Sequence, residues 1–332
     1  MGELEGYARP SPEALMSEFD LDPQESASAP LRVPAIPIHP ELATAARWLP
    51  RHLTNRWTLG PQRAITGLLR AFSRRGPAPV RVSATASLTL FNPRQPAQGL
   101  QPAVLWIHGG GYVAGDVQQD RERCAEMAEA TGAVVAAVSY RKAPEHPYPA
   151  ALDDCLAGLR ALRALPGIDP SRVAIGGASA GGGLAAALAL RVRDEGDPDL
   201  AAQLLLYPML DDRTERPSNE RNFRLWEHRS NGFAWAAYLD GADAEEAVPA
   251  RAASLARVAP AWIGVGTNDL FLGESRDYAR GLRAADVACK LVEVPGAWHA
   301  FDGFVPRAEV SREFFAAQYA FLRGRLRSEG DG

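Results

Sequence analysis

The sequence has 332 residues, 46% of them hydrophobic and 23% charged, with a formal net charge of −4 at pH 7. This composition is typical of a globular protein with a large apolar core, and the acidic balance argues against a protein that binds nucleic acid or anionic membranes through charge. No apolar run approaches the ~18 residues of a membrane-spanning helix, and the N-terminal sequence MGELEGYARP lacks the apolar stretch of a signal peptide, so we expect a cytoplasmic protein without stable membrane insertion.

The first 78 residues differ from the rest of the chain and predict an N-terminal cap segment. Closely spaced prolines favour an extended chain between two helices, which we expect at residues 12–19 and 61–72. We expect the apolar stripe of the second helix to pack on the rest of the protein; a lid or a membrane-facing helix is the alternative. The stripe consists of Ile65, Leu68, Leu69 and Phe72.

From residue 79 onward, strand-like and helix-like segments alternate, which predicts a doubly wound α/β sheet with helices on both faces. Several strands are continuously apolar, as expected for buried parallel strands, and the first two form a close pair that suggests an antiparallel start. The expected strands are residues 80–86, 88–91, 103–108, 133–140, 172–177, 202–207, 261–266 and 289–294, and the expected helices are residues 118–131, 149–165, 180–193, 274–286 and 308–326.

One segment interrupts this alternation. Residues 212–245 are first charged and then aromatic, and they are too long for a simple link between a strand and a helix. We interpret them as an insertion that lies over one edge of the sheet. The predicted organisation is therefore a cap segment (1–78), a first part of the core (79–211), a cap insertion (212–245) and a second part of the core (246–332).

The glycine-rich turn at residues 176–183, GGASAGGG, follows a strand and precedes a helix. Neither a dinucleotide-binding fingerprint nor a Walker loop fits it, because the glycines have the wrong spacing and no lysine follows them. Residues 177–181 do match G-x-S-x-G, the sharp turn that exposes a nucleophilic serine at the start of a helix. Small neighbours give that turn room, and the helix N-terminus favours developing negative charge. We therefore predict that Ser179 is a nucleophile.

A second motif, His108-Gly109-Gly110-Gly111, also follows a strand. It has the form of the HGGG loop, whose main-chain N–H groups stabilise the negative charge that acyl transfer builds on a carbonyl oxygen. We assign the oxyanion hole to the N–H groups of Gly110, Gly111 and Ala180.

A serine nucleophile needs a base and an acid, which follow it in the chain order Ser, acid, His. Of the two later histidines, His228 lies in the insertion, whereas His299 lies just past the last strand, where the carboxyl edge of a parallel sheet holds active groups. We therefore choose His299. For the acid we choose Asp269, just past the preceding strand; the rival Glu274 is expected to begin the next helix, where a carboxylate is favoured by the helix dipole alone.

Together these motifs resemble the hormone-sensitive-lipase-like esterases, the bacterial family IV carboxylesterases of the α/β-hydrolase fold. The resemblance runs from about residue 80 to the end, and it also includes YRKAPEHPYPAALDD (140–154), LLLYPMLD (204–211) and GAWHAF (296–301). It implies an eight-stranded, mostly parallel sheet and a helical cap built from N-terminal helices and an insertion.

The chain departs from the family pattern at three positions. Ala178 stands where Asp or Thr usually precedes the nucleophile, Gly183 replaces a common Asn, and Gly273 stands where the acid motif often has a second Asp. The three predicted catalytic residues are unaffected, but these departures leave the subfamily and substrate preference open.

We therefore predict a serine carboxylesterase that hydrolyses short-chain acyl esters through an acyl-enzyme. The expected partner is a small ester, the family resemblance allows a homodimer, and no cofactor or metal is implied. Tyr112 and Phe233 are candidates for the wall of the substrate pocket. An amidase or arylformamidase with the same machinery is the nearest alternative, and a non-catalytic small-molecule receptor on this fold is the alternative from another class.

The remaining polar and thiol groups are expected to be structural. His108, Glu145 and His146 are predicted to order loops near the site. The odd number of cysteines (Cys124, Cys155 and Cys289) and their spacing show no metal pattern. Cys155 and Cys289 lie in apolar contexts, so we expect buried, reduced thiols.

Overall fold

The structure is a computed structural model that describes residues 36–327 except 52–53, 56, 73–76, 97 and 218–219; the side chains of residues 66 and 68–72 are also left out. The helix expected at residues 12–19 lies outside the described residues. Three of the four side chains of the predicted apolar stripe also lie outside the described part of the structure. The fourth, Ile65, is 60% exposed. The expectation that this stripe packs on the protein is therefore wrong at Ile65 and untested at the others.

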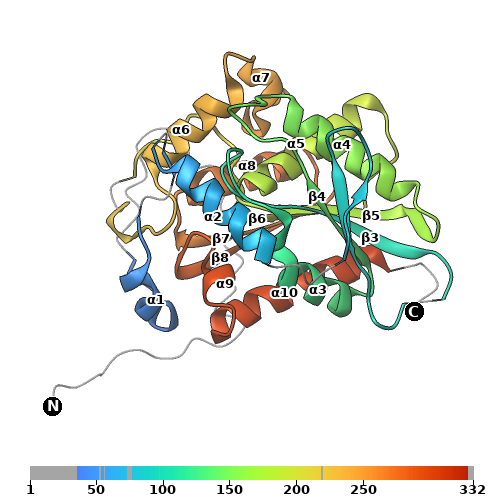
Figure 1. The fold of residues 1–332 in the computed structure, drawn as a ribbon, viewed down its shortest axis with the longest axis horizontal. Coiled ribbons are helices and arrows are strands. Elements are labelled where there is room, and N and C mark those ends of the chain that lie inside the picture. The colour runs from blue at the N-terminus through green and yellow to red at the C-terminus, as the bar shows by residue number, and fades with distance from the viewer. Residues whose placement is uncertain are drawn as a thin grey trace.

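The strands of the described residues are β1 (Val80–Arg81), β2 (Ser87–Phe91), β3 (Gln101–Ile107), β4 (Val134–Ser139), β5 (Ile168–Ala178), β6 (Gln203–Leu206), β7 (Ala261–Asn268) and β8 (Cys289–Trp298). They form one eight-stranded sheet in the order β1-β2-β4-β3-β5-β6-β7-β8 (Figure 1). β2 pairs antiparallel with β1 and β4, whereas the later pairs are parallel. The predicted sheet and its antiparallel start are confirmed.

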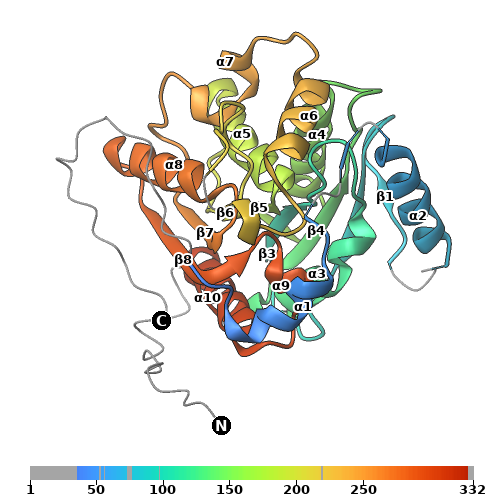
Figure 2. The ribbon, with the colours of Figure 1, turned by 90° about the vertical axis from the view of Figure 1, so that its left-hand side faces the viewer.

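The described helices are α1 (Ala43–Trp48), α2 (Leu59–Phe72), α3 (Arg121–Thr131), α4 (Ala150–Arg163), α5 (Ala180–Glu195), α6 (His228–Leu239), α7 (Ala244–Ala247), α8 (Leu272–Ala284), α9 (Phe301–Phe304) and α10 (Glu309–Leu326). They cover both faces of the sheet. α4, α5 and α8 pack on one face, and α1, α3 and α10 pack on the other (Figures 1 and 2).

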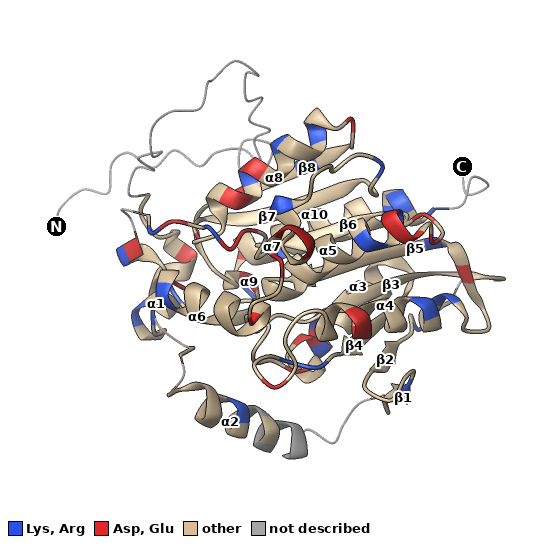
Figure 3. Ribbon diagram, turned by 90° about the horizontal axis from the view of Figure 1, so that it is seen from above, with Lys and Arg blue, Asp and Glu red and all other residues tan. Residues whose placement is uncertain are grey.

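Most charged side chains lie outside the central strands of the sheet. β3, β4, β6 and β7 contain no Asp, Glu, Lys or Arg, and the charged residues are found mostly on helices and loops (Figure 3). These four strands are almost completely buried, which explains their continuous apolar sequences. Cys124 and Cys155 are buried free thiols, and Cys289 is a free thiol that is only partly buried.

The prediction of the first strand, residues 80–86, is wrong over most of its length. Only Val80–Arg81 forms β1, because the hydroxyl of Ser83 accepts hydrogen bonds from the N–H groups of Thr85 (3.1 Å) and Ala86 (2.9 Å) and closes a turn. At the other edge, β7 and β8 run two and four residues further than expected. The longer β8 ends directly before His299.

The N-terminal helices and the insertion reach the core through a few specific contacts. The guanidinium of Arg63 on α2 donates hydrogen bonds to the carbonyl oxygens of Val113 (2.7 Å) and Ala143 (2.5 Å) and forms an ion pair with Glu145 (2.6 Å). The insertion contains α6 and the first two residues of α7. Among the described helices, none is long and apolar enough to cross a membrane.

Candidate active site

Ser179 occupies a sharp turn between β5 and α5. Its φ is 58°, in the left-handed region that a residue with a side chain rarely adopts. Its N–H donates to the carbonyl oxygen of Leu206 (2.8 Å), and its own carbonyl accepts from the N–H groups of Gly183 and Met209 (both 3.0 Å). These bonds hold the strained backbone and present the side chain at the carboxyl end of the sheet.

The two glycines that flank Ser179 are required by backbone packing. A Cβ atom at Gly177 would overlap the main chain of Gly181, and one at Gly181 would overlap the carbonyl group of Ile107. The G-x-S-x-G pattern therefore reflects the close approach of β5, β3 and the first turn of α5.

The structure brings Ser179, His299 and Asp269 together in one hydrogen-bonded chain. His299 Nε2 lies 3.0 Å from Ser179 Oγ, and His299 Nδ1 lies 2.8 Å from Asp269 Oδ2. The other oxygen of Asp269 accepts from the N–H of Phe271 (3.0 Å), which fixes the carboxylate. Ser179 follows β5, His299 follows β8 and Asp269 follows β7. These strands are parallel, so their carboxyl ends lie at the same edge of the sheet and bring the three residues together.

Aromatic side chains surround His299. Its ring meets Tyr207 and Phe271 edge-on, with centroid separations of 4.9 and 5.2 Å, and Trp226 of the insertion lies 6.3 Å away. Ser179 is only 7% exposed and Asp269 3% exposed. The polar chain is thus set in an apolar surrounding with little water, where its hydrogen bonds are stronger than in solution.

The first of the three glycines after His108 lies against the serine turn. A Cβ at Gly109 would crowd Ala178 and Ser179, and Gly110 and Gly111 have φ values of 127° and 59°. Among the hydrogen bonds of the described residues, none is donated by the main-chain N–H groups of Gly110, Gly111 or Ala180. Their assignment as an oxyanion hole stays a prediction.

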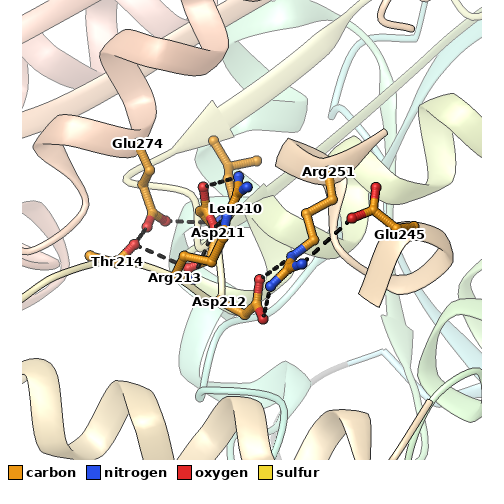
Figure 4. A network of polar contacts seen from close by, with 8 residues as sticks. All are labelled: Leu210, Asp211, Asp212, Arg213, Thr214, Glu245, Arg251 and Glu274. Atoms are coloured by element: carbon orange, nitrogen blue, oxygen red, sulfur yellow. Dashed lines mark hydrogen bonds and ion pairs between the residues drawn. The ribbon is translucent and has the colours of Figure 1, made fainter. Parts of the chain in front are cut away.

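Glu274, the rival candidate for the acid, belongs to another network. It is buried in the first turn of α8, where burial raises its pKa well above the usual value. It accepts hydrogen bonds from the N–H of Leu210 (2.7 Å) and from the hydroxyl of Thr214 (Figure 4). The neighbouring Asp212 pairs with Arg251 (2.7 Å) in the same region. Glu274 thus joins α8 to the chain that leads into the insertion.

The other predicted residues have distinct surroundings. Tyr112 is buried, stacks on Tyr238 (4.1 Å between centroids) and donates its hydroxyl to Met209 O (3.0 Å), while Phe233 on α6 is partly buried. Their role as the wall of a substrate pocket stays a prediction. His228 begins α6 and is not part of the Ser179 chain.

Two of the three loop residues predicted to be structural, Glu145 and His108, contact other parts of the protein. Glu145 is exposed and pairs with Arg63, and the hydrogen bond from this guanidinium lowers its pKa. His108 is buried and stacks on Tyr140 at 4.3 Å. His146 is exposed. Among the described residues, no group of three or more His, Cys, Asp or Glu could hold a metal ion.

Sequence reasoning missed Trp226, Tyr207 and Asp302 as neighbours of the site. The hydroxyl of Tyr207 donates to Asp302 (2.9 Å), three residues after His299. The aromatic density of residues 212–245 was the signal for Trp226, but no local pattern indicated which aromatic residue reaches His299.

A mostly parallel sheet with a serine turn after β5, an acid after β7 and a histidine after β8 defines an α/β-hydrolase. The family model described as alpha/beta hydrolase fold matches residues 104–303, and the chain belongs to this family. Carboxylesterase NlhH of Mycobacterium tuberculosis is 36% identical over 238 residues, with 68% of this chain and 74% of the relative covered. Esterase LipI of the same species is 37% identical over 228 residues, covering 66% and 70%.

Solved structures agree with this assignment. A bacterial heroin esterase is similar with a TM-score of 0.77 and 34% identity, over 88% of this chain and 98% of the other. Esterase LipW from Mycobacterium marinum is similar with a TM-score of 0.76 and 30% identity, over 90% and 98%.

Proposed function

We propose that this chain is a serine esterase that hydrolyses short-chain acyl esters, with Ser179 as nucleophile. The observation that carries the proposal is the continuous hydrogen-bonded chain from Ser179 through His299 to Asp269, with separations of 3.0 and 2.8 Å. Relatives in both comparisons bear the names esterase or carboxylesterase, and the chain is a carboxylic ester hydrolase. The short-chain preference comes from the family resemblance.

In the proposed mechanism, His299 Nε2 takes the proton of Ser179 as Oγ attacks the ester carbonyl. The N–H groups of Gly110, Gly111 and Ala180 stabilise the resulting oxyanion. His299 then gives its proton to the leaving alcohol, and a water molecule repeats the cycle on the acyl-enzyme. Asp269 accepts the hydrogen bond from Nδ1, which keeps Nε2 free to act as the base.

We also propose that residues 36–72 and the insertion at 212–245 act as one cap. Two contacts support this. The guanidinium Nε of Arg224 donates to the carbonyl oxygen of Ala46 (2.5 Å), and the N–H of Leu225 donates to the carbonyl oxygen of Pro50 (2.9 Å). The first segment and the insertion are thus joined directly, next to the aromatic side chains around His299.

The test is hydrolysis of p-nitrophenyl butyrate by Ser179→Ala. We expect kcat/KM to fall by about 10⁴-fold or more, because the variant loses the covalent pathway. A matched control is Ser275→Ala, which changes a buried serine of α8 whose hydroxyl has no hydrogen-bond partner among the described residues and leaves Ser179 intact.

Covalent labelling gives an independent readout. A fluorophosphonate should label the wild type and Ser275→Ala at Ser179, and should not label Ser179→Ala. Full activity of Ser179→Ala, or a wild type that neither labels nor hydrolyses any ester, would overturn the proposal. Matched amide substrates in the same assay decide between esterase and amidase through their kcat/KM values.

A further inference from the structure

The indole of Trp226 lies over the proposed oxyanion hole. A Cβ atom built on Gly111 would overlap the outer edge of its six-membered ring, and the ring lies tilted 34° to His299 at 6.3 Å between centroids. Trp226 is 5% exposed. One side chain of the insertion therefore flanks both the glycine loop and the histidine.

Trp226 is held firmly in this place. The preceding Leu225 has a φ of 69°, a strained value for a bulky residue, and its side chain is buried. The N–H of Trp226 donates to the carbonyl oxygen of Arg224 (2.8 Å), and the indole Nε1 donates to Asn231 Oδ1 on α6 (3.3 Å). Strain at a fixed position next to a reactive group is typical of functional sites.

The orientation of the ester in the proposed mechanism determines whether its acyl portion or its alcohol portion lies next to the indole of Trp226. The carbonyl oxygen points to the N–H groups of Gly110 and Gly111, and the leaving oxygen must reach His299 Nε2 to receive its proton. The alcohol portion therefore leaves past His299. The indole of Trp226 flanks both Gly111 and His299. It therefore limits the space that is available to the alcohol portion, not the space for the acyl chain.

We infer that Trp226 limits the size of the alcohol portion of the ester, so that esters of small alcohols are preferred. This inference rests on the proposed function. It assigns Trp226 as a specificity residue, with no part in proton transfer or in the nucleophilic attack.

The experiment compares two pairs of esters by pH-stat. Ethyl and cyclohexyl butyrate differ in the alcohol, and ethyl acetate and ethyl hexanoate differ in the acyl chain. In Trp226→Ala, the kcat/KM ratio of cyclohexyl to ethyl butyrate should rise about tenfold or more, because a bulky group gains the space of the indole. The acyl-chain ratio should change by less than about threefold.

Trp235→Phe is the matched control. Trp235 is a buried indole of the same insertion that packs on Tyr112 (5.1 Å) and whose Nε1 has no partner among the described residues. This variant should leave both ratios near the wild-type values. Trp226→Phe should raise the alcohol ratio by about twofold to fourfold, because it retains one ring, and it decides the question if Trp226→Ala does not fold.

Two results would overturn the inference while the proposed function stands: an unchanged alcohol ratio in folded Trp226 variants that still label with a fluorophosphonate, or a shift in the acyl-chain ratio instead. A wild type that labels nowhere and hydrolyses none of the four esters is a different result, since it rejects the proposed function itself and the inference with it.

Discussion

At the scale of single residues, His108 is a histidine that the fold keeps uncharged. Its Nδ1 lies 2.8 Å from the carbonyl oxygen of Gly109, which can only accept, so the proton resides on Nδ1. Its Nε2 is buried without a hydrogen-bond partner among the described residues. Burial, and secondly the charge of Lys142, lower the pKa of His108 to about 4. A second proton on this ring would have no acceptor.

This geometry predicts a specific loss of stability in acid. The unfolded chain takes up a proton at His108 near the usual pKa of 6.5, whereas the folded chain does so only near 4, so stability falls as the pH drops through this window. Between pH 7 and pH 5 the free energy of unfolding should fall by about 2 kcal/mol from this group alone. Urea unfolding of His108→Gln at both pH values should lack this part of the decrease.

The exposed His146 supplies the control for this measurement. His146→Gln should keep the acid sensitivity of the wild type, because its ring is exposed to water in the folded chain as well. If His108→Gln and the wild type lose equal stability between pH 7 and pH 5, the assignment of an uncharged His108 is wrong.

At the scale of elements, a buried ion pair joins α3 to α9 beneath His299. The guanidinium of Arg123 lies 2.8 Å from Asp302, and the side chain of Asp302 is completely buried. The second oxygen of Asp302 accepts from the hydroxyl of Tyr207, whose ring contacts His299. The helix that follows His299 is thereby fixed to α3 on the same face of the sheet.

Removing one partner of this pair should be strongly destabilising. Asp302→Ala removes the carboxylate that is hydrogen-bonded to the buried guanidinium of Arg123 and leaves Asp120 as its remaining acidic neighbour. We expect the free energy of unfolding to fall by about 3–5 kcal/mol in urea unfolding. The double variant Arg123→Met/Asp302→Leu removes both charges and should recover a large part of this loss. A double variant no more stable than Asp302→Ala would contradict the ion-pair explanation.

At the scale of the whole molecule, the N-terminal segment ties distant parts of the chain together. The carbonyl oxygen of Ile36 accepts from the side chains of Asn222 in the insertion and Asn268 before the acid, both at 3.0 Å. The N–H of His39 donates to the carbonyl oxygen of Gly296 before the histidine (3.0 Å). A short stretch near the N-terminus thus supports both loops that carry Asp269 and His299.

Further along the same segment, Arg63 attaches α2 to the core. One guanidinium satisfies two carbonyl oxygens and a carboxylate on the core, a set that only its planar arrangement of donors can serve. Arg63→Gln should therefore increase the rate at which trypsin or chymotrypsin cleaves near α2, by about tenfold, which corresponds to a loss of roughly 1.4 kcal/mol against local opening. The midpoint of global unfolding should change much less.

The variant Glu145→Gln distinguishes the contribution of the ion pair from that of the hydrogen bonds to the two carbonyl oxygens. It removes only the exposed ion pair, which is worth little, so cleavage should rise by less than about twofold. Equal cleavage of Arg63→Gln and the wild type would mean that α2 is held by other contacts.

The sequence by itself determined the chain order of the eight strands, the main helices between them and the three residues of the hydrogen-bonded chain, whereas the helices α1, α6, α7 and α9 were not predicted. This was possible because the relevant signals are local. Apolar strands alternate with helices, the serine turn requires glycines that show in the sequence, and the ends of parallel strands meet at one edge, so Asp269 and His299 could be chosen from their positions after strands.

Only the tertiary structure decided which distant side chains meet. Arg123 and Asp302 are 179 positions apart, and Trp226 reaches Gly111 from an insertion whose sequence has no regular period. The end of the first strand at Arg81 and the exposure of Ile65 were equally hidden. Such contacts depend on the packing of whole elements against one another, and short sequence patterns do not encode that packing.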